Sequence, residues 1–388
     1  MILILASGIR PEERERLLEF ASDHGYEPRL LSETLEGGRQ LLMLSGGPEG
    51  PDPDGLDGIR LLPGVERVLD FTDALPRTTA ASDTAAIDPF WSADEDDCFD
   101  FSPRSLIWIA GPCSVDNPEF LGEVATAAAR AGASMLRGGA FKPRTSPYAF
   151  QGQGREGLLL LAAVARDLRL PFVTEVLDPR DVEFVAEHAD MIQIGARNMQ
   201  NQPLLREVGA SGRPVMLKRG MAATMGELLA SAEYLLDAGC TSLVLCERGV
   251  RNFDTSRRAL LDLSIVPALR ERTALPVLVD PSHATGRKSL VTPMAKAAVA
   301  AGADGIMIEA HPHPEQALSD GSQALLPAEL AAMGKSLRAL AALEGRRIPT
   351  SPLFREDLTE GATDESATAQ TQSNNPQERP PRRSRTNP

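Results

Sequence analysis

The sequence is poor in the residues that several protein classes depend on. Its 388 residues include only four cysteines, none in a Cys-x-x-Cys pair, and only five histidines. Sparse, unpatterned cysteines argue against a disulfide framework and favour a cytoplasmic protein with free thiols. The small number of histidines leaves few candidate imidazole ligands for a metal.

Long apolar runs and a broad basic surface are also absent. Arginines, acids and prolines interrupt each apolar stretch before it reaches the length of a membrane span, which predicts no membrane association. Residues 1–8 are briefly hydrophobic but have no basic flank, so they predict a strand and not a signal peptide. A net charge of −14 argues against nucleic acid as a partner, because such binding needs a broad basic face.

Composition divides the chain into four parts. Residues 1–72 predict a small ferredoxin-like α+β domain, with strands at 1–5, 40–44 and 65–71 and helices at 11–25 and near 54–61. Residues 73–100 predict a mobile linker, and residues 346–388 a disordered tail with too little apolar surface to fold.

Between linker and tail, residues 101–345 repeat one pattern eight times, a short apolar run followed by a stretch of helical spacing. The apolar runs are Leu106–Ala110, Ser134–Leu136, Phe172–Val176, Met191–Ile194, Val215–Leu217, Ser242–Leu245, Val277–Val279 and Gly305–Ile308. Eight such units predict a closed (β/α)8 TIM barrel. A doubly wound open sheet would bring a Gly-x-Gly-x-x-Gly loop after the first strand, where this chain has Gly-Pro-Cys-Ser.

Polar residues follow the predicted strands with regularity, and barrel active sites form at these strand ends. Six cations are expected to converge there: Arg137, Lys142, Arg144, Arg197, Lys218 and Arg248. Like charges held together repel unless anions neutralise them, so the cluster predicts at least two anionic groups, such as phosphates or a phosphate and a carboxylate. The glycines of Arg137-Gly-Gly-Ala-Phe-Lys142-Pro-Arg144 let the backbone approach an anion closely.

A metal site is a second hypothesis from the strand ends. A thiolate, an imidazole and two carboxylates suit Mn, Fe, Co or Zn better than Mg or Ca, and the candidates are Cys113, His283, Glu309 and Asp320. The alternative is an inert buried cysteine and a core histidine. His311 shares the side-chain parity of Glu309 and is a rival ligand.

Longer motifs carry a resemblance to a known family. Gly111-Pro-Cys-Ser, Leu136-Arg-Gly-Gly-Ala-Phe-Lys-Pro-Arg-Thr-Ser-Pro-Tyr, Gln193-Ile-Gly-Ala-Arg-Asn-Met-Gln-Asn, Leu217-Lys-Arg-Gly, Cys246-Glu-Arg-Gly and Asp280-Pro-Ser-His-Ala-Thr-Gly-Arg occur in this order. They resemble the type Iβ branch of 3-deoxy-D-arabino-heptulosonate 7-phosphate (DAHP) synthase across most of 101–335. Residues 1–72 resemble the ferredoxin-like allosteric domain that some members carry.

The resemblance implies a metal-dependent transferase of the shikimate pathway that joins phosphoenolpyruvate to D-erythrose 4-phosphate. It implies a divalent metal at Cys113, His283, Glu309 and Asp320, with Lys142, Cys113 and His283 as catalytic residues. It assigns phosphoenolpyruvate to Arg137, Lys142, Arg197, Lys218 and Arg248, and erythrose 4-phosphate to Lys142, Pro143, Arg144 and Thr145.

The resemblance also implies regulation. A homo-oligomer, either a dimer or a tetramer, is expected, with tyrosine or phenylalanine as the effector and a separate chorismate mutase as a candidate partner. The 73–100 linker would let the N-terminal domain swing across the barrel mouth.

Two alternatives stay open. One is 3-deoxy-D-manno-octulosonate 8-phosphate synthase, which typically has Lys-Ala-Asn-Arg-Ser-Ser where this chain has Lys142-Pro-Arg-Thr-Ser. The shorter, stiffer loop fits the shorter sugar. The other is a non-catalytic barrel that senses anions.

Overall fold

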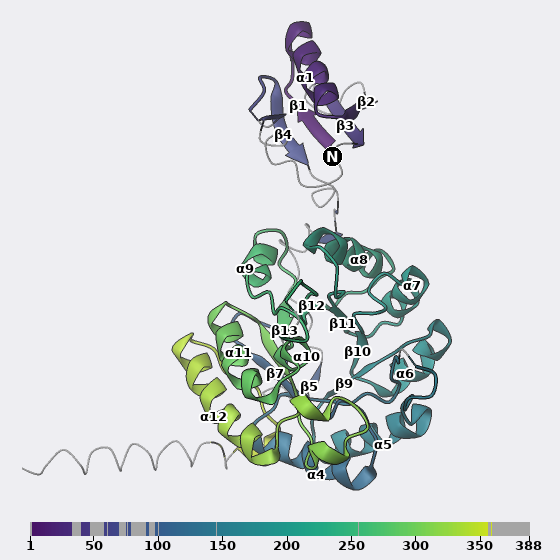
Figure 1. Ribbon diagram of the computed structural model, residues 1–388, viewed down its shortest axis with the longest axis vertical. Helices are drawn as coiled ribbons and strands as arrows, with labels where there is room; N and C mark the ends of the chain where they lie inside the picture. The colour runs from purple at the N-terminus through teal and green to yellow at the C-terminus, as the bar shows by residue number, and fades with distance from the viewer. Residues whose placement is uncertain are drawn as a thin grey trace, which may run out of the picture.

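A closed barrel and a small antiparallel sheet make up the described part of the chain (Figure 1). The computed structural model describes residues 2–32, 40–46, 58–59, 61–69, 75, 77–78, 91–92, 98–99, 101–355 without Thr145 and Thr255, and 358. Among these residues, no helix combines the length and apolar character needed to cross a membrane.

The N-terminal unit has the expected ferredoxin-like arrangement. Its elements are β1 (Ile2–Leu5), α1 (Pro11–Asp23), β2 (Tyr26–Ser32), β3 (Gln40–Gly46) and β4 (Val65–Leu69). The strands lie in the order β2-β3-β1-β4, and their pairings are antiparallel. Alternate residues of β1 turn Leu3 and Leu5 onto Leu17 of α1, which gives the unit its own core. Of the helix expected near 54–61, the structure describes Gly58 and Ile59, which are helical, and Leu61, which lies in a turn.

Part of the predicted linker is anchored on the barrel. The backbone N–H groups of Arg77 and Thr78 each donate to the carboxylate of Glu233 at 2.9 Å. Thr78 is buried, and its carbonyl accepts from the Thr273 hydroxyl at 2.7 Å. Leu75 packs against the apolar layer outside the barrel. We call Leu75, Arg77 and Thr78 the linker anchor.

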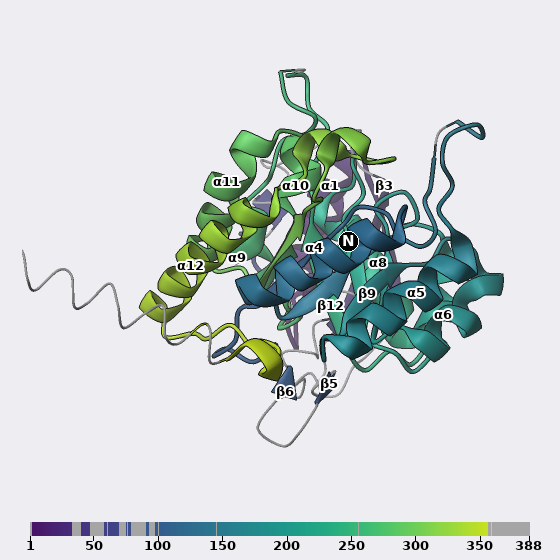
Figure 2. The ribbon, with the colours of Figure 1, turned by 90° about the horizontal axis from the view of Figure 1, so that it is seen from below.

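The barrel has eight parallel strands, as the sequence predicts. They are β7 (Ile107–Gly111), β8 (Met135–Arg137), β9 (Phe172–Glu175), β10 (Met191–Ile194), β11 (Val215–Lys218), β12 (Leu243–Glu247), β13 (Val277–Val279) and β14 (Gly305–Glu309). Pairing of β14 with β7 closes the barrel. Most predicted runs begin or end within two residues of the observed strands. The two-stranded sheet of β5 (Trp91–Ser92) and β6 (Cys98–Phe99) lies at the end of the barrel opposite α10 (Figure 2).

Helices surround the barrel and follow its strands. They are α4 (Pro118–Ala131), α5 (Gly154–Asp167), α6 (Val182–His188), α7 (Gln202–Ala210), α8 (Met225–Asp237), α9 (Ile265–Arg270), α10 (Pro281–Thr285), α11 (Lys288–Ala300) and α12 (Pro327–Leu343). The start of α4 shows why helices begin where they do, because the Asn117 side chain accepts from the backbone N–H groups of Glu119 and Phe120. Gly132, at a φ of 92°, ends the same helix in the left-handed conformation.

Strand alternation separates two apolar layers. Ile107 and Ile109 of β7 face the barrel interior with residues such as Met216, whereas Trp108 faces the surrounding helices. The interior layer is made of Phe101, Ile107, Ile109, Met135, Val173, Met191, Met216, Val244, Cys246, Leu278 and Met307. Because this layer fills the barrel with side chains, the site lies above it, at the carboxyl ends of the strands.

Ordered packing continues past the predicted domain boundary at residue 345. Leu106 donates its N–H to the carbonyl of Arg347 at 2.8 Å, and the Ser351 hydroxyl donates to the carbonyl of Leu168 at 2.8 Å. A 3-10 turn follows at Pro352–Phe354. The segment 346–355 therefore packs on the barrel and does not belong to a disordered tail. Apart from residue 358, the rest of the expected tail lies outside the described residues.

Candidate active site

Side-chain alternation explains why the polar residues converge. Met135, Met216 and Met307 face the barrel interior, and the residue two positions further along each strand faces the same way. Those residues are Arg137, Lys218 and Glu309, and each is buried. The same two-residue spacing relates other interior residues to buried polar residues at strand ends. Glu175 follows Val173, Arg248 follows Cys246, and Asp280 follows Leu278.

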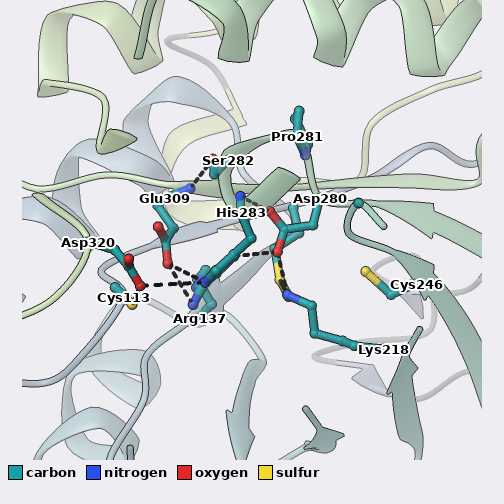
Figure 3. A network of polar contacts seen from close by, with 12 residues as sticks. Cys113, Arg137, Lys218, Cys246, Asp280, Pro281, Ser282, His283, Glu309 and Asp320 are labelled. Atoms are coloured by element: carbon teal, nitrogen blue, oxygen red, sulfur yellow. Dashed lines mark hydrogen bonds and ion pairs between the residues drawn. The ribbon is translucent and has the colours of Figure 1, made fainter. Parts of the chain in front are cut away.

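Four predicted ligands meet on one side of the barrel mouth. Ligand atoms of Cys113, His283, Glu309 and Asp320 all lie within 4.8 Å of one another. We call these four residues the ligand cluster. The Cys113 thiol lies 3.2 Å from Oδ2 of Asp320, and Nε2 of His283 lies 3.0 Å from Oε1 of Glu309. Figure 3 shows the three polar side chains pointing toward one another beside Cys113.

The electrostatics of the cluster are those of a site built for a cation. Burial lowers the pKa of His283, but the carboxylates of Asp280 and Glu309 outweigh it and raise the pKa to about 9. Burial would raise the pKa of Glu309, yet His283 and Arg137 hold it well below its usual range. The protonated imidazole thus supplies positive charge among the carboxylates of the cluster.

The donor set fits a divalent metal. Oε1 of Glu309 is buried and accepts no hydrogen bond of good geometry from a described residue, although His283 and Arg137 are near. Nδ1 of His283 lies 2.6 Å from Oδ2 of Asp280, which leaves Nε2 facing the cluster. A thiolate, one imidazole nitrogen and two carboxylates suit Mn, Fe, Co or Zn. The rival His311 does not belong to this cluster.

His311 is directed elsewhere by the loop after β14. Its backbone N–H donates to the carbonyl of Leu325 at 2.9 Å. Its Nδ1 accepts from the N–H of His313 at 3.0 Å, while its Nε2 faces Asp116 at 3.7 Å and its ring meets Phe120 edge-on. His311 lies two residues after Glu309, a spacing that would put both side chains on the same face of a strand. The strand ends before His311, however, so this side chain does not enter the site.

Two of the buried cations, Arg137 and Lys142, lie beside Cys113. Both are buried, and no described residue accepts a hydrogen bond from Nε or NH1 of Arg137. Burial lowers the pKa of Arg137, but Glu309 and Cys113 reverse that effect and raise it. Nζ of Lys142 lies 2.9 Å from the carbonyl of Cys113 and 3.1 Å from its sulfur. A buried guanidinium with free donors is a binding group for an anion.

A cleft beside the ligand cluster brings further cations together. Lys142, Arg144, Arg197, Lys218 and Arg248 line it, along with His283 and Asp320. Arg248 is buried, and burial lowers its pKa although Asp280 opposes this effect. Lys218 forms an ion pair with Asp280, the same carboxylate that contacts His283 (Figure 3).

The loop after β8 forms the outer wall of this cleft. Pro143 accepts a hydrogen bond on its carbonyl from Arg197 at 3.2 Å, and Arg144 donates to the carbonyl of Leu318 at 3.2 Å. Pro143 itself lines the cleft. The last predicted residue of this loop, Thr145, lies outside the described residues.

Two glycines allow the close approaches that shape the site. A Cβ atom on Gly139 would lie 2.7 Å from both the carbonyl of Cys113 and Cδ of Lys142. A Cβ atom on Gly195 would lie 1.9 Å from the Glu175 carboxylate. Position 139 therefore requires glycine because the carbonyl of Cys113 is backbone, whereas a side chain at position 195 would displace the Glu175 carboxylate.

Sequence reasoning missed several residues of the cleft. Glu175 and Gln193 lie in its floor, with Gln193 donating to Glu175 at 3.3 Å. Arg258 comes from the loop after β12 and reaches the cleft from outside the barrel. Glu175 was visible as a strand-end acid, whereas nothing in the sequence distinguished Arg258 from its neighbour Arg257.

Comparison with known proteins places the barrel in a family. Phospho-2-dehydro-3-deoxyheptonate aldolase of Thermotoga maritima is 53% identical over 217 residues, which are 56% of this chain and 64% of that protein. The alignment thus spans slightly less than two thirds of that relative. A 2-dehydro-3-deoxyphosphooctonate aldolase of Desulfotalea psychrophila is 31% identical over 242 residues, 58% of this chain and 85% of that protein.

Two solved structures of related proteins also match this chain. The crystal structure of the Thermotoga maritima phospho-2-dehydro-3-deoxyheptonate aldolase, also titled DAHP synthase, matches with a TM-score of 0.66 and 37% identity over 89% of this chain and 98% of that one. A truncated form of the 3-deoxy-D-arabino-heptulosonate 7-phosphate synthase from the same organism matches with a TM-score of 0.59 and 44% identity, covering 63% and 90%. The model of the DAHP synthetase I family matches residues 101–343, more than half of the sequence, and the chain therefore belongs to that family.

Proposed function

We propose that this protein condenses phosphoenolpyruvate with D-erythrose 4-phosphate to give DAHP and inorganic phosphate, the first step of the shikimate pathway. The observation that carries the proposal is the buried Arg137, which has donors without a partner among the described residues and lines a small cavity with Cys113 and Lys142, next to the cation-lined cleft that Lys142 also lines. The 53% identity to the Thermotoga maritima aldolase supports the same reaction.

The cations hold the two anionic substrates. Arg137, Lys218 and Arg248 are buried and bind phosphoenolpyruvate, which carries a carboxylate and a phosphate. Arg144 lies at the outer wall, where it binds the phosphate of erythrose 4-phosphate with Pro143 and Thr145. Arg197 and Lys142 line the same cleft and also bind phosphoenolpyruvate, and Lys142 contacts erythrose 4-phosphate as well. The substrates are thereby held with the reacting carbons facing each other, which removes much of the entropic barrier.

The chemistry follows from that placement. C3 of phosphoenolpyruvate bonds to the aldehyde carbon of erythrose 4-phosphate, and the aldehyde oxygen takes up a proton to become a hydroxyl. A water oxygen adds at C2, and the C2–O bond to phosphate breaks to leave a ketone and inorganic phosphate; one proton of that water leaves with the phosphate, and the other restores the group that protonated the aldehyde oxygen. A divalent metal bound by Cys113, His283, Glu309 and Asp320 supplies Lewis acidity toward the aldehyde oxygen. Lys142, with Nζ 3.1 Å from the Cys113 sulfur, is placed to donate the proton to that oxygen.

Residues 1–72 regulate this reaction in our proposal. Their described part contributes none of the cluster or cleft residues. Tyrosine or phenylalanine is the proposed effector, bound between domains of a homo-oligomer, either a dimer or a tetramer, and a separate chorismate mutase is the proposed partner. Sparse, unpatterned cysteines support a cytoplasmic location.

A direct assay tests the proposal against its alternatives. Purified protein supplied with Mn²⁺ and phosphoenolpyruvate is given either erythrose 4-phosphate or arabinose 5-phosphate, and released phosphate and the sugar product are measured. We expect turnover with the four-carbon sugar. Preferential turnover of arabinose 5-phosphate would identify an octulosonate synthase, as the 31% identical relatives are named. Anion binding without turnover of either sugar would identify a sensor.

A further inference from the structure

The two carboxylates of the ligand cluster each have one inner and one outer oxygen. The inner oxygens are Oε1 of Glu309, 3.0 Å from Nε2 of His283, and Oδ2 of Asp320, 3.2 Å from the Cys113 sulfur. The outer oxygens face two residues that belong to no proposed role so far. Oε2 of Glu309 accepts from the side-chain amide of Gln323, and Oδ1 of Asp320 accepts from Arg258 at 2.9 Å.

Arg258 and Gln323 are themselves joined. The same NH1 group of Arg258 that contacts Asp320 donates to Oε1 of Gln323 at 3.0 Å. One continuous hydrogen-bonded chain therefore runs from Glu309 through Gln323 and Arg258 to Asp320. It passes along the outer side of the cluster and leaves the inner oxygens of both carboxylates directed at the thiol and the imidazole.

The structure also fixes Arg258 against the helix that carries His283. The N–H of Ala259 donates to the carbonyl of Ala284 at 3.0 Å. Gly286 ends α10 in the left-handed conformation, and a Cβ atom there would lie 2.8 Å from Cβ of Arg258. Because Gly286 has no side chain, the aliphatic stem of Arg258 can pack against it. Arg258 contacts the α10 segment, Asp320 and Gln323 at once.

We propose that Arg258 and Gln323 are positioning residues for the metal. They hold the outer oxygens of Asp320 and Glu309 so that the inner oxygens keep the orientation that metal binding requires, which lowers the cost of ordering the site. The guanidinium also offsets the repulsion between two neighbouring carboxylates before the metal arrives. This inference rests on the metal site of the proposed function, but it concerns metal affinity and not the identity of the sugar substrate.

Binding of Co²⁺ tests the proposal without an activity assay. Affinity is measured by competition with a fluorescent chelator, and geometry is measured from the ligand-field and thiolate-to-cobalt absorption bands. Arg258→Met keeps the length of the stem and removes the donors. We expect it to weaken Co²⁺ binding about 10- to 100-fold and to shift the absorption bands, with Arg258→Lys recovering part of the loss.

Gln323→Met gives a second, independent measurement. It removes the amide that holds Glu309 and leaves Arg258 in place, so we expect a loss of the same order. Because the two residues act through one chain, the double variant should lose less affinity than the product of the two single losses. Arg257→Met is the matched control, since Arg257 is exposed and pairs with Asp254. We expect the control to bind Co²⁺ within about threefold of the unmodified protein.

Three outcomes would overturn the positioning role. They are unchanged Co²⁺ affinity and spectra in both Arg258→Met and Gln323→Met, an equal loss in Arg257→Met, or a raised KM for a substrate with unchanged metal affinity. The last result would make Arg258 a substrate-binding residue. Should Arg258→Met fail to fold, Gln323→Met and Arg258→Lys carry the test. Unmodified protein that binds no Co²⁺ would overturn the metal site itself, which distinguishes this failure from the others.

Discussion

Oδ2 of Asp280 lies 2.6 Å from Nδ1 of His283, and the same oxygen forms an ion pair with Lys218. One buried carboxylate therefore orients the imidazole of the ligand cluster and a cation of the substrate cleft. Metal-binding histidines commonly use their second nitrogen in this way. The arrangement connects the ligand cluster to the cation-lined cleft through a single side chain.

Replacing Asp280 by asparagine tests this coupling. Asp280→Asn keeps the shape but removes the charge that supports His283 and neutralises Lys218. We expect metal affinity to fall about 10- to 100-fold and the KM for phosphoenolpyruvate to change as well. Metal titration and steady-state kinetics measure the two effects. Asp254→Asn, in an exposed loop, is the control. Normal metal affinity in Asp280→Asn would contradict the orienting role.

Metal binding should release a proton from His283. In metal-free protein its pKa is raised to about 9, so at pH 7 the imidazole is charged and must lose the Nε2 proton to bind a metal. Metal affinity should therefore rise with pH and lose this contribution to the slope above about pH 9. Calorimetry in buffers of different ionisation enthalpy counts the protons. Release that is unchanged between pH 7 and pH 10 would contradict the prediction.

Metal affinity should rise with pH, but the same raised pKa should make metal-free protein less stable as pH rises. A histidine whose folded-state pKa lies above its unfolded value of about 6.5 stabilises the fold fully below that pH. This contribution to the free energy of unfolding is lost as pH rises through about 9. Denaturant unfolding of metal-free protein across this window measures it, with His283→Asn as the comparison.

We expect Cys113 to be needed for metal binding and Cys246 not to be. Cys113→Ser should keep the fold but lose at least about tenfold in metal affinity together with most activity, because it removes the only thiolate of the ligand cluster. Cys246→Ser is the matched control, since Cys246 faces the barrel interior.

Thiol labelling extends the comparison. Burial raises the pKa of Cys246 to about 12 and that of Cys240 to about 11, so both thiols stay protonated at pH 8. Iodoacetamide followed by peptide mapping should leave both unmodified in folded protein. Cys113→Ser with normal metal content, or rapid labelling of Cys246, would refute this division.

Lys142 and Arg144 should differ although one proline separates them. Lys142 is buried against Cys113, whereas Arg144 lies on the outer wall and contacts Leu318. Lys142→Ala should lower kcat by about 10²–10⁴ and impair the use of both substrates. Arg144→Ala should chiefly raise the KM for erythrose 4-phosphate, by about 10- to 100-fold. Equal effects of Arg144→Ala on both KM values would argue against separate roles.

Removing residues 1–72 should separate regulation from catalysis. A protein that begins at Asp73 keeps the linker anchor and every described residue of the cleft. We expect it to retain substantial activity and to lose inhibition by tyrosine or phenylalanine. Activity is measured with and without each amino acid. A truncated protein that is still inhibited would place the effector site on the barrel.

The sequence was sufficient for the parts of the site that lie on strands. Alternation within a barrel strand fixes which residues face the mouth, so Arg137, Lys218 and Glu309 were identified from position alone. Asp320 lies in a loop eleven residues after Glu309, where strand position does not fix the direction of a side chain, so the sequence could name it only as one of four candidate metal ligands. His311 shows the limit of this rule, because side chains alternate between the two faces only as far as the strand extends.

Loops that fold back over the mouth were the least predictable. Arg257 and Arg258 are adjacent and chemically identical, yet one pairs with Asp254 of its own loop and the other reaches Asp320 of the ligand cluster. Gln323 is similarly hidden in a loop. At the C-terminus, Ile348 and Phe354 pack against the barrel's outer layer. These two apolar side chains were the signal that the ordered structure continues beyond residue 345.

The linker anchor sets a limit on how far the N-terminal unit can travel. β4 ends at Leu69, and Leu75 is already packed on the barrel, so six residue steps join the two bodies. Fully extended, they span about 20 Å. Residues 79–100 do not lengthen this tether, because they follow the anchor in the sequence. The N-terminal unit is therefore tethered within about 20 Å of the linker anchor on α8. Any regulatory contact that it makes must lie within that distance.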